Sequence, residues 1–358
     1  MSQNQPILRL AGLLKKFNGF TALDSVDLSV SEGEFLAIVG PSGSGKTTLI
    51  RLLVGMDEQT DGTIWLRDER LDTVPANERP TCMVFQSLAL FPHRTVGQNI
   101  EFPLKIRKVD AARRKERALE LLNLLRLPEH YYDRRINECS GGERQRIALA
   151  RALAFDPEIL FFDEPLSALD YRLRKTLEKE LKDLHQRTGK TFIYITHSLE
   201  EAMVMSDRIA IMRKGQFEQI GPGEEIYARP QSRFVAEFMG EVNLFPARPG
   251  EGAHAFEGLA VDDKAAAQQG LIAAEGAYLM VRPEKVRVLE EGERADFTTA
   301  GTVHAGYLLG SRRQYEIERG DQKPLIIEIV QDGSPPLADG ARVRLGFDAG
   351  DTHLVERD

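Results

Sequence analysis

The chain has 358 residues and a formal net charge of −8, and 42% of its residues are hydrophobic and 28% charged. This length suits two domains, and the composition is that of a folded globular protein rather than a disordered chain. The acidic balance gives no basic footprint for nucleic acid, and the apolar runs are far shorter than the roughly 18 residues of a membrane-spanning helix. Cys82 and Cys139 are too few for a disulfide framework, and the opening residues have no secretory signal pattern, which together favour a reducing cytosol.

Two short strand-like runs, residues 7–10 and 26–30, come first, with an expected loop between them that carries Phe17 and Phe20. An aromatic ring ahead of a ligand-binding loop can stack on a base. We therefore assign Phe17 to base stacking, with the alternative that either phenylalanine belongs to the core.

A glycine-rich loop follows the apolar run Phe35–Val39 and opens a leucine-rich helix. Its glycines let successive backbone N–H groups point at one anion, and the helix start adds the positive end of a dipole. Lys46 can reach the β- and γ-phosphates of ATP, and Thr47 offers a hydroxyl to Mg²⁺. The alternative is a purely structural turn. The expected ATP-binding residues are Gly40, Pro41, Ser42, Gly43, Ser44, Gly45, Lys46, Thr47 and Thr48.

Gln86 directly follows the strand-like run 81–85, at the strand end where ligands of open α/β sheets collect. Its amide can contact Mg²⁺ or the attacking water. The next residues, 87–96, are apolar but interrupted by proline and basic side chains. They form either an exposed docking loop or a buried connector.

Two helices are predicted between residues 110 and 153. Asp110 caps the first, whose apolar face we expect to be core. Ser140, Gly141, Gly142 and Glu143 open the second, with the serine and the glutamate at capping-box spacing. A cap does not need two glycines, whereas a phosphate that approaches bare backbone does. We therefore predict a second anion-binding helix start, with a well-capped helix as the alternative.

The apolar run 159–162 ends in Asp163 and Glu164. Because strand alternation sends neighbouring side chains to opposite sides, the two carboxylates cannot do the same job. We assign Asp163 to Mg²⁺, together with Thr47 and Gln86, and Glu164 to the general base. The alternative is a solvated carboxylate pair.

Two further polar residues follow. Asp170 precedes a helix and either contacts the ligand or only caps that helix. The apolar run 191–196 delivers His197 to the sheet edge of Gln86 and Glu164, which favours a catalytic over a structural histidine.

Beyond residue 221 the pattern changes. Residues 225–239 are predicted as one helical stretch and 250–270 as loop, and the remainder carries short, glycine-punctuated strands typical of a small β-barrel or sandwich. The expected strands are 278–281, 286–289, 313–317, 325–329 and 343–347.

These motifs, in this order, resemble the ATP-binding subunit of an ATP-binding-cassette (ABC) importer. The matching segments are 40–47 (Walker A), Gln86 (Q-loop), 140–143 (signature), 159–164 (Walker B), 167–170 (D-loop) and His197 (switch histidine). Residues 281–284 resemble the regulatory β-domain of importers for polyamines, sugars and ferric iron, and 234–243 is most similar to the polyamine branch.

The resemblance implies an α/β P-loop NTPase of the ABC type over residues 1–240, with a helical subdomain at about 88–158, followed by an OB-like all-β barrel over 241–358. It implies an ATPase that uses ATP and Mg²⁺ to drive spermidine or putrescine import. The implied partners are a second copy packed head to tail, two transmembrane permease subunits and, indirectly, a periplasmic or surface solute-binding protein. No nucleic acid is implied, and the location is peripheral, at the cytoplasmic face of the inner membrane.

The alternatives are an importer for sugar or ferric iron, a soluble ABC-type ATPase that acts on nucleic acid or the ribosome, and a non-transport regulator whose β-domain senses a ligand. Two residues depart from the usual signature, with Cys139 at a common leucine and Glu143 at a common glutamine. A carboxylate should repel a triphosphate. We hypothesise that Glu143 folds back on the Ser140 backbone N–H, a role that glutamine also fills.

Overall fold

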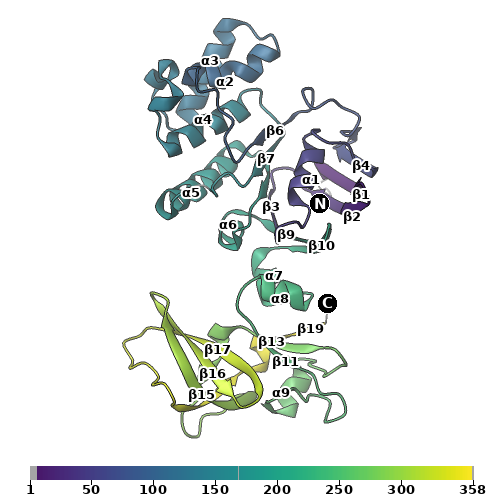
Figure 1. The fold of residues 1–358 in the computed structure, drawn as a ribbon, viewed down its shortest axis with the longest axis vertical. Helices are drawn as coiled ribbons and strands as arrows, with labels where there is room; N and C mark the ends of the chain where they lie inside the picture. Colours follow the sequence, from purple (N-terminus) through teal and green to yellow (C-terminus); the bar gives the residue numbers. More distant parts are fainter. Residues whose placement is uncertain (1–5, 168, 357–358) are drawn as a thin grey trace. The chain divides into compact units, whose positions relative to one another are not determined.

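The computed structural model describes residues 6–167 and 169–356, so Ala168 of the 167–170 segment lies outside the described residues. Contacts divide the chain into two compact units, Met1–Gly223 and Glu224–Asp358 (Figure 1). This division falls before the expected boundary at 240. The reason is that α8 (Arg233–Phe238) packs through Ala236 against Met280 and Val355 of the second unit.

The first unit is built on a six-stranded sheet with the order β10-β9-β3-β8-β7-β6. Five strands are parallel, and β10 is antiparallel to β9. The strands are β3 (Phe35–Val39), β6 (Thr81–Val84), β7 (Ile159–Asp163), β8 (Thr191–Ile195), β9 (Arg208–Arg213) and β10 (Gln216–Gly221). The central strands β3 and β8 are buried throughout because both faces of the sheet are covered.

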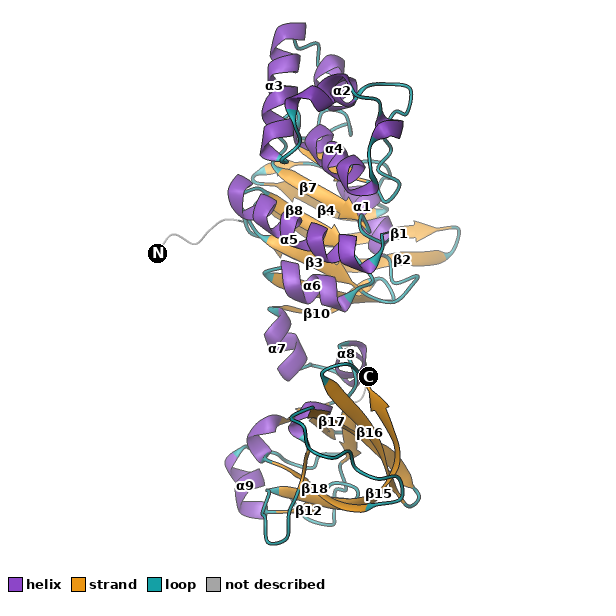
Figure 2. Ribbon diagram, turned by 90° about the vertical axis from the view of Figure 1, so that its left-hand side faces the viewer, coloured by secondary structure: helices purple, strands orange, loops and turns teal. Residues whose placement is uncertain are grey.

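Side-chain alternation along these strands feeds two separate cores. Phe162, Phe192 and Tyr194 pack with α5 (Tyr171–Thr188) and the end of α6 (Leu199–Met205), and Figure 2 shows α5 lying along the sheet. Phe161 and Ile193 point the other way and pack with α1 (Lys46–Leu53). The expected α/β class with a parallel sheet is confirmed.

An antiparallel sheet, β2-β1-β4-β5, shares the second core. Its strands are β1 (Leu8–Phe17), β2 (Phe20–Val30), β4 (Asp61–Leu66) and β5 (Glu69–Arg70). The prediction of a loop between residues 10 and 26 was wrong, because β1 and β2 form one long hairpin. Asn18 and Gly19, with φ of 40° and 87°, make its tight turn. Phe17 and Phe20 are 42% and 64% exposed, which excludes a core position for either ring.

A helical segment lies between β6 and β7. It contains α2 (Val96–Ile106), α3 (Ala111–Leu124) and α4 (Gly141–Leu153), with short 3-10 turns at Glu129–Asp133 and Ile136–Glu138. Asp110 caps α3 by accepting from the N–H groups of Ala112 and Arg113, and Leu121 and Leu122 are buried, as predicted. Across residues 6–167 and 169–356, no helix combines the length and hydropathy needed to cross a bilayer.

The second unit is mainly antiparallel β-structure. Its sheets have the orders β11-β13-β19 and β14-β18-β15-β16-β17, with β12 paired to β15. The strands are β11 (Asn243–Pro246), β12 (Ala260–Val261), β13 (Tyr278–Val281), β14 (Arg287–Val288), β15 (Phe297–Leu308), β16 (Arg312–Arg319), β17 (Gln322–Val330), β18 (Arg342–Phe347) and β19 (Thr352–Val355). Phe297 stacks on Phe347 at its centre.

Two sequence predictions for this region were wrong. Residues 225–239 are not one helix but α7 (Gly223–Ala228) and α8, because Pro230 lies between them and cannot continue a helix. The predicted loop 250–270 contains β12 and α9 (Asp263–Gln268). Asp262 caps α9, so this stretch has a helix start of its own.

Candidate functional site

A cavity of about 430 Å³ lies at the carboxyl end of the parallel sheet. The glycine-rich residues 40–45, called the phosphate loop below, follow strand β3, and Glu164 and His197 follow the neighbouring strands β7 and β8. All three meet at this cavity. The lining residues are Phe20, Ala22, Gly40, Ser42, Gly43, Ser44, Gly45, Lys46, Thr47, Thr48, Glu164 and His197. The sequence therefore identified most of the lining. It missed Ala22 and assigned the aromatic role to Phe17, whereas Phe20 lines the cavity.

The loop from Gly40 to Gly45 has no room for side chains at its two ends. A Cβ on Gly40 would lie 2.1 Å from the Met212 carbonyl oxygen, and one on Gly45 would lie 2.7 Å from the Ala22 carbonyl oxygen. Gly45 also precedes α1 without any side-chain cap. The first N–H groups of α1 are therefore open to an anion.

Lys46 is the cation of the cavity and is 8% exposed. Its Nζ donates to the carbonyl oxygens of Gly40 and Pro41 at 2.8 and 3.0 Å. Burial lowers the pKa of the ammonium, and the carboxylates of Glu164 and Asp163 partly offset this by raising it. The ammonium is thus held by the backbone of the loop at the place where a phosphate chain would lie.

Asp163 and Glu164 have different surroundings, because Asp163 is the last residue of β7 and Glu164 lies beyond the strand. Burial raises the pKa of the Asp163 carboxyl, Glu164 raises it further, and Lys46 lowers it. The backbone N–H of Glu164 donates to the Ile195 carbonyl at 3.0 Å, with Glu164 at a left-handed φ of 46°. Its Oε2 lies 3.2 Å from Nδ1 of His197. Glu164 lines the cavity, whereas Asp163 does not.

Gln86 reaches this site through one hydroxyl. Its Nε2 donates to Oγ of Ser167 at 2.9 Å, and the same hydroxyl donates to the Glu164 carbonyl at 2.9 Å. Asp170 caps α5, with Oδ1 accepting from the Leu173 N–H at 3.1 Å. The cap is present, and a ligand contact by the exposed Asp170 stays a prediction.

Ser140 and Glu143 form the predicted capping box. The Ser140 N–H donates to Oε2 of Glu143 at 2.6 Å, and the Glu143 N–H donates to Oγ of Ser140 at 3.3 Å. Tyr131 donates its hydroxyl to the other carboxylate oxygen at 2.6 Å. The Tyr131 hydroxyl, followed by the Ser140 N–H, holds the pKa of Glu143 below its usual value. The carboxylate is thus turned back onto its own chain, as the fold-back hypothesis requires.

The two glycines of this helix start differ. A Cβ on Gly142 would lie 3.1 Å from Cδ1 of Leu173, so tight packing partly explains that glycine, while Gly141 has ordinary space around it. Cys139 is 4% exposed and fills an apolar position next to Ser140. Residues 140–143 do not line the cavity of their own chain.

Comparison with known proteins identifies the family. Residues 23–167 match the ABC transporter family, and 279–355 match the TOBE domain. The chain is 42% identical over 325 residues to "Spermidine/putrescine import ATP-binding protein PotA 1" of Pseudomonas aeruginosa, covering 87% of this chain and 85% of that protein. The chain belongs to the ABC transporter ATPases.

A second relative of this ABC ATPase is "Spermidine/putrescine import ATP-binding protein PotA" of Mannheimia succiniciproducens. It is 48% identical over 246 residues, which cover 69% of this chain and 66% of that protein, just under two thirds. Among solved structures, the post-hydrolysis dimer of the cassette MJ0796 bound to ADP and Pi has a TM-score of 0.53 at 31% identity. The match covers 60% of this chain and 98% of the MJ0796 chain.

A further solved structure, cbiO1 from Clostridium perfringens, has a TM-score of 0.58 at 26% identity. The match covers 63% of this chain and 91% of the cbiO1 chain. The predicted ABC fold and the β-domain that follows it are confirmed. As an ABC ATPase the chain binds nucleotide, and the cavity above is the candidate site.

Proposed function

We propose that the chain is the ATP-hydrolysing subunit of an importer for spermidine or putrescine. The observation that carries the proposal is the meeting of the phosphate loop, Glu164 and His197 at one cavity. The named relatives, two spermidine/putrescine import proteins, support the choice of cargo.

Hydrolysis follows from the charges around the cavity. The loop N–H groups and Lys46 bind the phosphate chain of ATP and stabilise the negative charge that develops on the γ-phosphate. Glu164 takes the proton of the attacking water. His197, 3.2 Å from Glu164 through Nδ1, orients that carboxylate and offers its other ring nitrogen to the γ-phosphate.

Thr47, Asp163 and Gln86 are the residues proposed to hold Mg²⁺. In the described part of the chain, no three His, Cys, Asp or Glu side chains cluster as a metal site. Mg²⁺ fits nevertheless, because it usually takes one or two protein oxygens and completes its shell with water and phosphate oxygens. When bound, it would neutralise part of the charge on the phosphates.

The active ATPase is proposed to be a head-to-tail homodimer. Residues 140–143 lie outside the cavity of their own chain, yet they form the start of a helix, where backbone N–H groups lack intrahelical acceptors. A second copy would place this helix start, and Asp170, against the γ-phosphate bound by the first. Closure on ATP and reopening after hydrolysis then drive the cycle.

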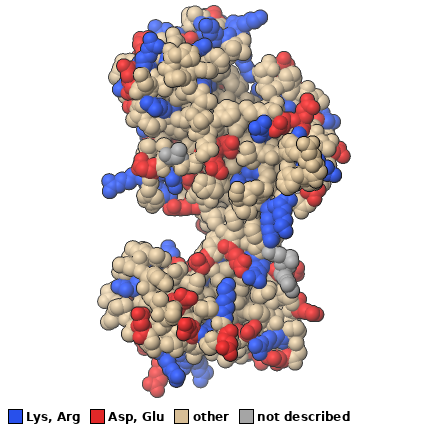
Figure 3. All heavy atoms as spheres, in the orientation of Figure 1, with Lys and Arg blue, Asp and Glu red and all other residues tan. Residues whose placement is uncertain are grey.

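Two transmembrane permease subunits are the proposed membrane partners, docked at the loop that follows Gln86, with a solute-binding protein that delivers the cargo. The ATPase would then be peripheral, at the cytoplasmic face of the membrane. On the face drawn in Figure 3, basic and acidic side chains are interspersed rather than gathered into one basic patch. On this face, the distribution gives no basic footprint for nucleic acid.

The test is the ATPase rate of the chain assembled with its permease subunits in lipid, with each cargo presented on its binding protein. We expect spermidine or putrescine to raise the rate several-fold and maltose and ferric iron to leave it unchanged. Stimulation by maltose or ferric iron would refute the polyamine assignment. If the chain purifies without any permease subunit and binds nucleic acid in a salt-sensitive way, the transport role is refuted.

A further inference from the structure

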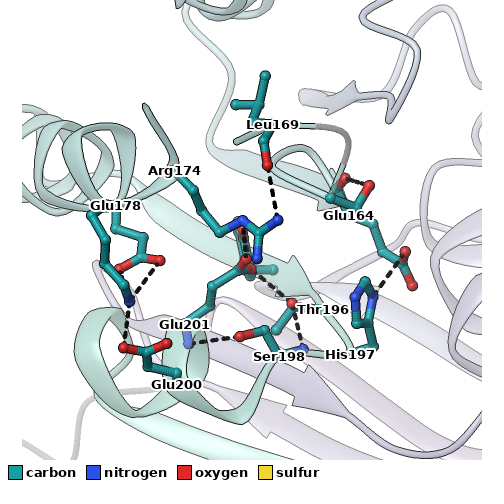
Figure 4. A network of polar contacts seen from close by, with 12 residues as sticks. Glu164, Leu169, Arg174, Glu178, Thr196, His197, Ser198, Glu200 and Glu201 are labelled. Carbon is teal, nitrogen blue, oxygen red and sulfur yellow. Dashed lines mark hydrogen bonds and ion pairs between the residues drawn. The ribbon is translucent and has the colours of Figure 1, made fainter. Parts of the chain in front are cut away.

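A buried polar cluster lies behind His197, and the hydrolysis steps above do not use it. Glu201 at the start of α6 is 3% exposed, and Tyr194 and Thr196 beside it are 0% and 2% exposed. Figure 4 shows Glu201 between the His197 segment and Arg174 of α5. Burying a carboxylate this deeply destabilises the fold unless its contacts offset the free energy of desolvation.

One oxygen of Glu201 fixes the backbone on both sides of His197. Oε2 accepts from the hydroxyls of Tyr194 and Thr196 at 2.8 and 2.7 Å. Oγ1 of Thr196 accepts from the Ser198 N–H at 3.0 Å, and the Ser198 hydroxyl accepts from the Glu201 N–H at 3.2 Å. These bonds close a ring around the short segment that carries His197 (Figure 4).

The other oxygen faces a second segment. Oε1 of Glu201 lies 3.9 Å from Nε of Arg174, and Nη2 of Arg174 donates to the Leu169 carbonyl at 2.9 Å. Leu169 belongs to the loop whose Ser167 bonds the Glu164 carbonyl. Glu201 and Arg174 therefore connect the two segments that hold His197 and Glu164.

The Arg174–Glu201 contact is loose on one side. Within the described residues, Nε of Arg174 is buried without a hydrogen-bond acceptor. Shortening the contact by about 1 Å would make a charge-assisted hydrogen bond. The pair can thus tighten when the two segments approach.

Stability alone is a weak reason for this arrangement, because well-packed apolar side chains often stabilise a fold as well as a buried ion pair does. We propose that Glu201 and Arg174 are positioning residues that set the segment 196–198, which carries His197, and the residues Ser167 and Leu169 at the spacing that hydrolysis requires. This inference rests on the proposed ATPase function.

The test compares Glu201→Gln and Arg174→Met with wild type. Glutamine keeps an oxygen for Tyr194 and Thr196 but loses the charge that attracts Arg174. We expect kcat for ATP to fall roughly 10- to 100-fold, because small misplacements of catalytic groups cost that much. KM for ATP should stay within about twofold, since no cavity-lining residue changes. Arg174→Lys, which keeps the charge, should restore part of kcat.

The double variant should be no slower than the slower single variant, because the two residues act through one contact. Glu34→Gln is the matched control. Glu34 is 7% exposed and paired with Arg208 at 3.0 Å, but it lies just before β3, at the end of that strand opposite the phosphate loop. It should lower the melting temperature as much as Glu201→Gln does, with kcat unchanged.

Values of kcat within twofold of wild type for both single variants, or losses that multiply in the double variant, would overturn the inference alone. A fall in kcat that only follows the loss of folded protein would also overturn it. Absence of hydrolysis by wild type would instead refute the proposed function. Arg174 is partly exposed, so Arg174→Met should still fold if Glu201→Gln does not. In that case the kcat of Arg174→Met alone tests the inference.

Discussion

Replacing Glu164 with glutamine should separate nucleotide binding from hydrolysis. The substitution preserves shape and leaves a polar group at the 3.2 Å contact with His197, but an amide cannot take a proton from water. Loss of a positioned general base costs roughly 10²–10⁴ in rate, or about 3–5 kcal/mol of barrier. We expect kcat to fall by that factor.

Nucleotide affinity should not fall with the rate. The Glu164 carboxylate raises the pKa of the buried Asp163, so its removal lets Asp163 ionise more readily. A neutral residue 164 also repels the phosphates less. We therefore expect Mg²⁺-ATP to bind Glu164→Gln at least as tightly as wild type.

The assay measures phosphate release at saturating Mg²⁺-ATP, together with equilibrium binding of ATP. Glu69→Gln is the control, because Glu69 is exposed on β5 and does not line the cavity. Turnover within twofold of wild type would remove Glu164 as the base. A tenfold loss of ATP affinity would show that the substitution damages the phosphate loop instead.

Substitutions at three further residues give four more predictions. If Phe17 stacks on the base, as the sequence predicts, Phe17→Ala should weaken ATP binding about 5- to 30-fold, measured by titration. Because Phe20 lines the cavity, a loss seen only with Phe20→Ala would transfer that contact to Phe20. Glu143→Gln should change ATP-driven dimerisation less than threefold by light scattering, and marked tightening would refute the fold-back role of the carboxylate. Because the folded-state pKa of Glu143 lies below its usual 4.5, the stability that its charge adds is present above pH 4.5 and is lost as pH falls through the lower value. The difference in melting temperature between wild type and Glu143→Gln should therefore shrink as the pH falls below 4.5. Arg282, 3% exposed, donates to the carbonyls of Tyr227 and Ala236, so Arg282→Met should destabilise the second unit by about 3 kcal/mol in calorimetry, and a loss below about 1 kcal/mol would contradict this.

The parts of the site that are contiguous in the chain, or that end parallel strands, could be predicted. Lys46 follows its own glycine loop, and Glu164 and His197 each come just after a buried strand, so the topology of a parallel sheet places them at one edge. The Ser140–Glu143 cap was equally accessible, because both partners lie within one helical turn.

Contacts between distant segments could not be predicted in this way. Nothing in the spacing of Tyr131 and Glu143 shows that the hydroxyl meets the carboxylate, and Gln86 meets Ser167 only because β6 and β7 are neighbours. The position of Phe20 was within reach, since Asn18-Gly19 is a strong hairpin signal that would have joined β1 to β2.

The left-handed φ of Glu164 has a consequence for how this position tolerates change. Most residues with a side chain lose roughly 1 kcal/mol or more of stability in this conformation, whereas glycine loses little and asparagine loses less than most. Glu164→Gly should therefore relieve backbone strain, but it would also remove the carboxylate that is proposed to accept the proton of water. On the proposed mechanism, a substitution that stabilises this strand end would therefore lower the activity.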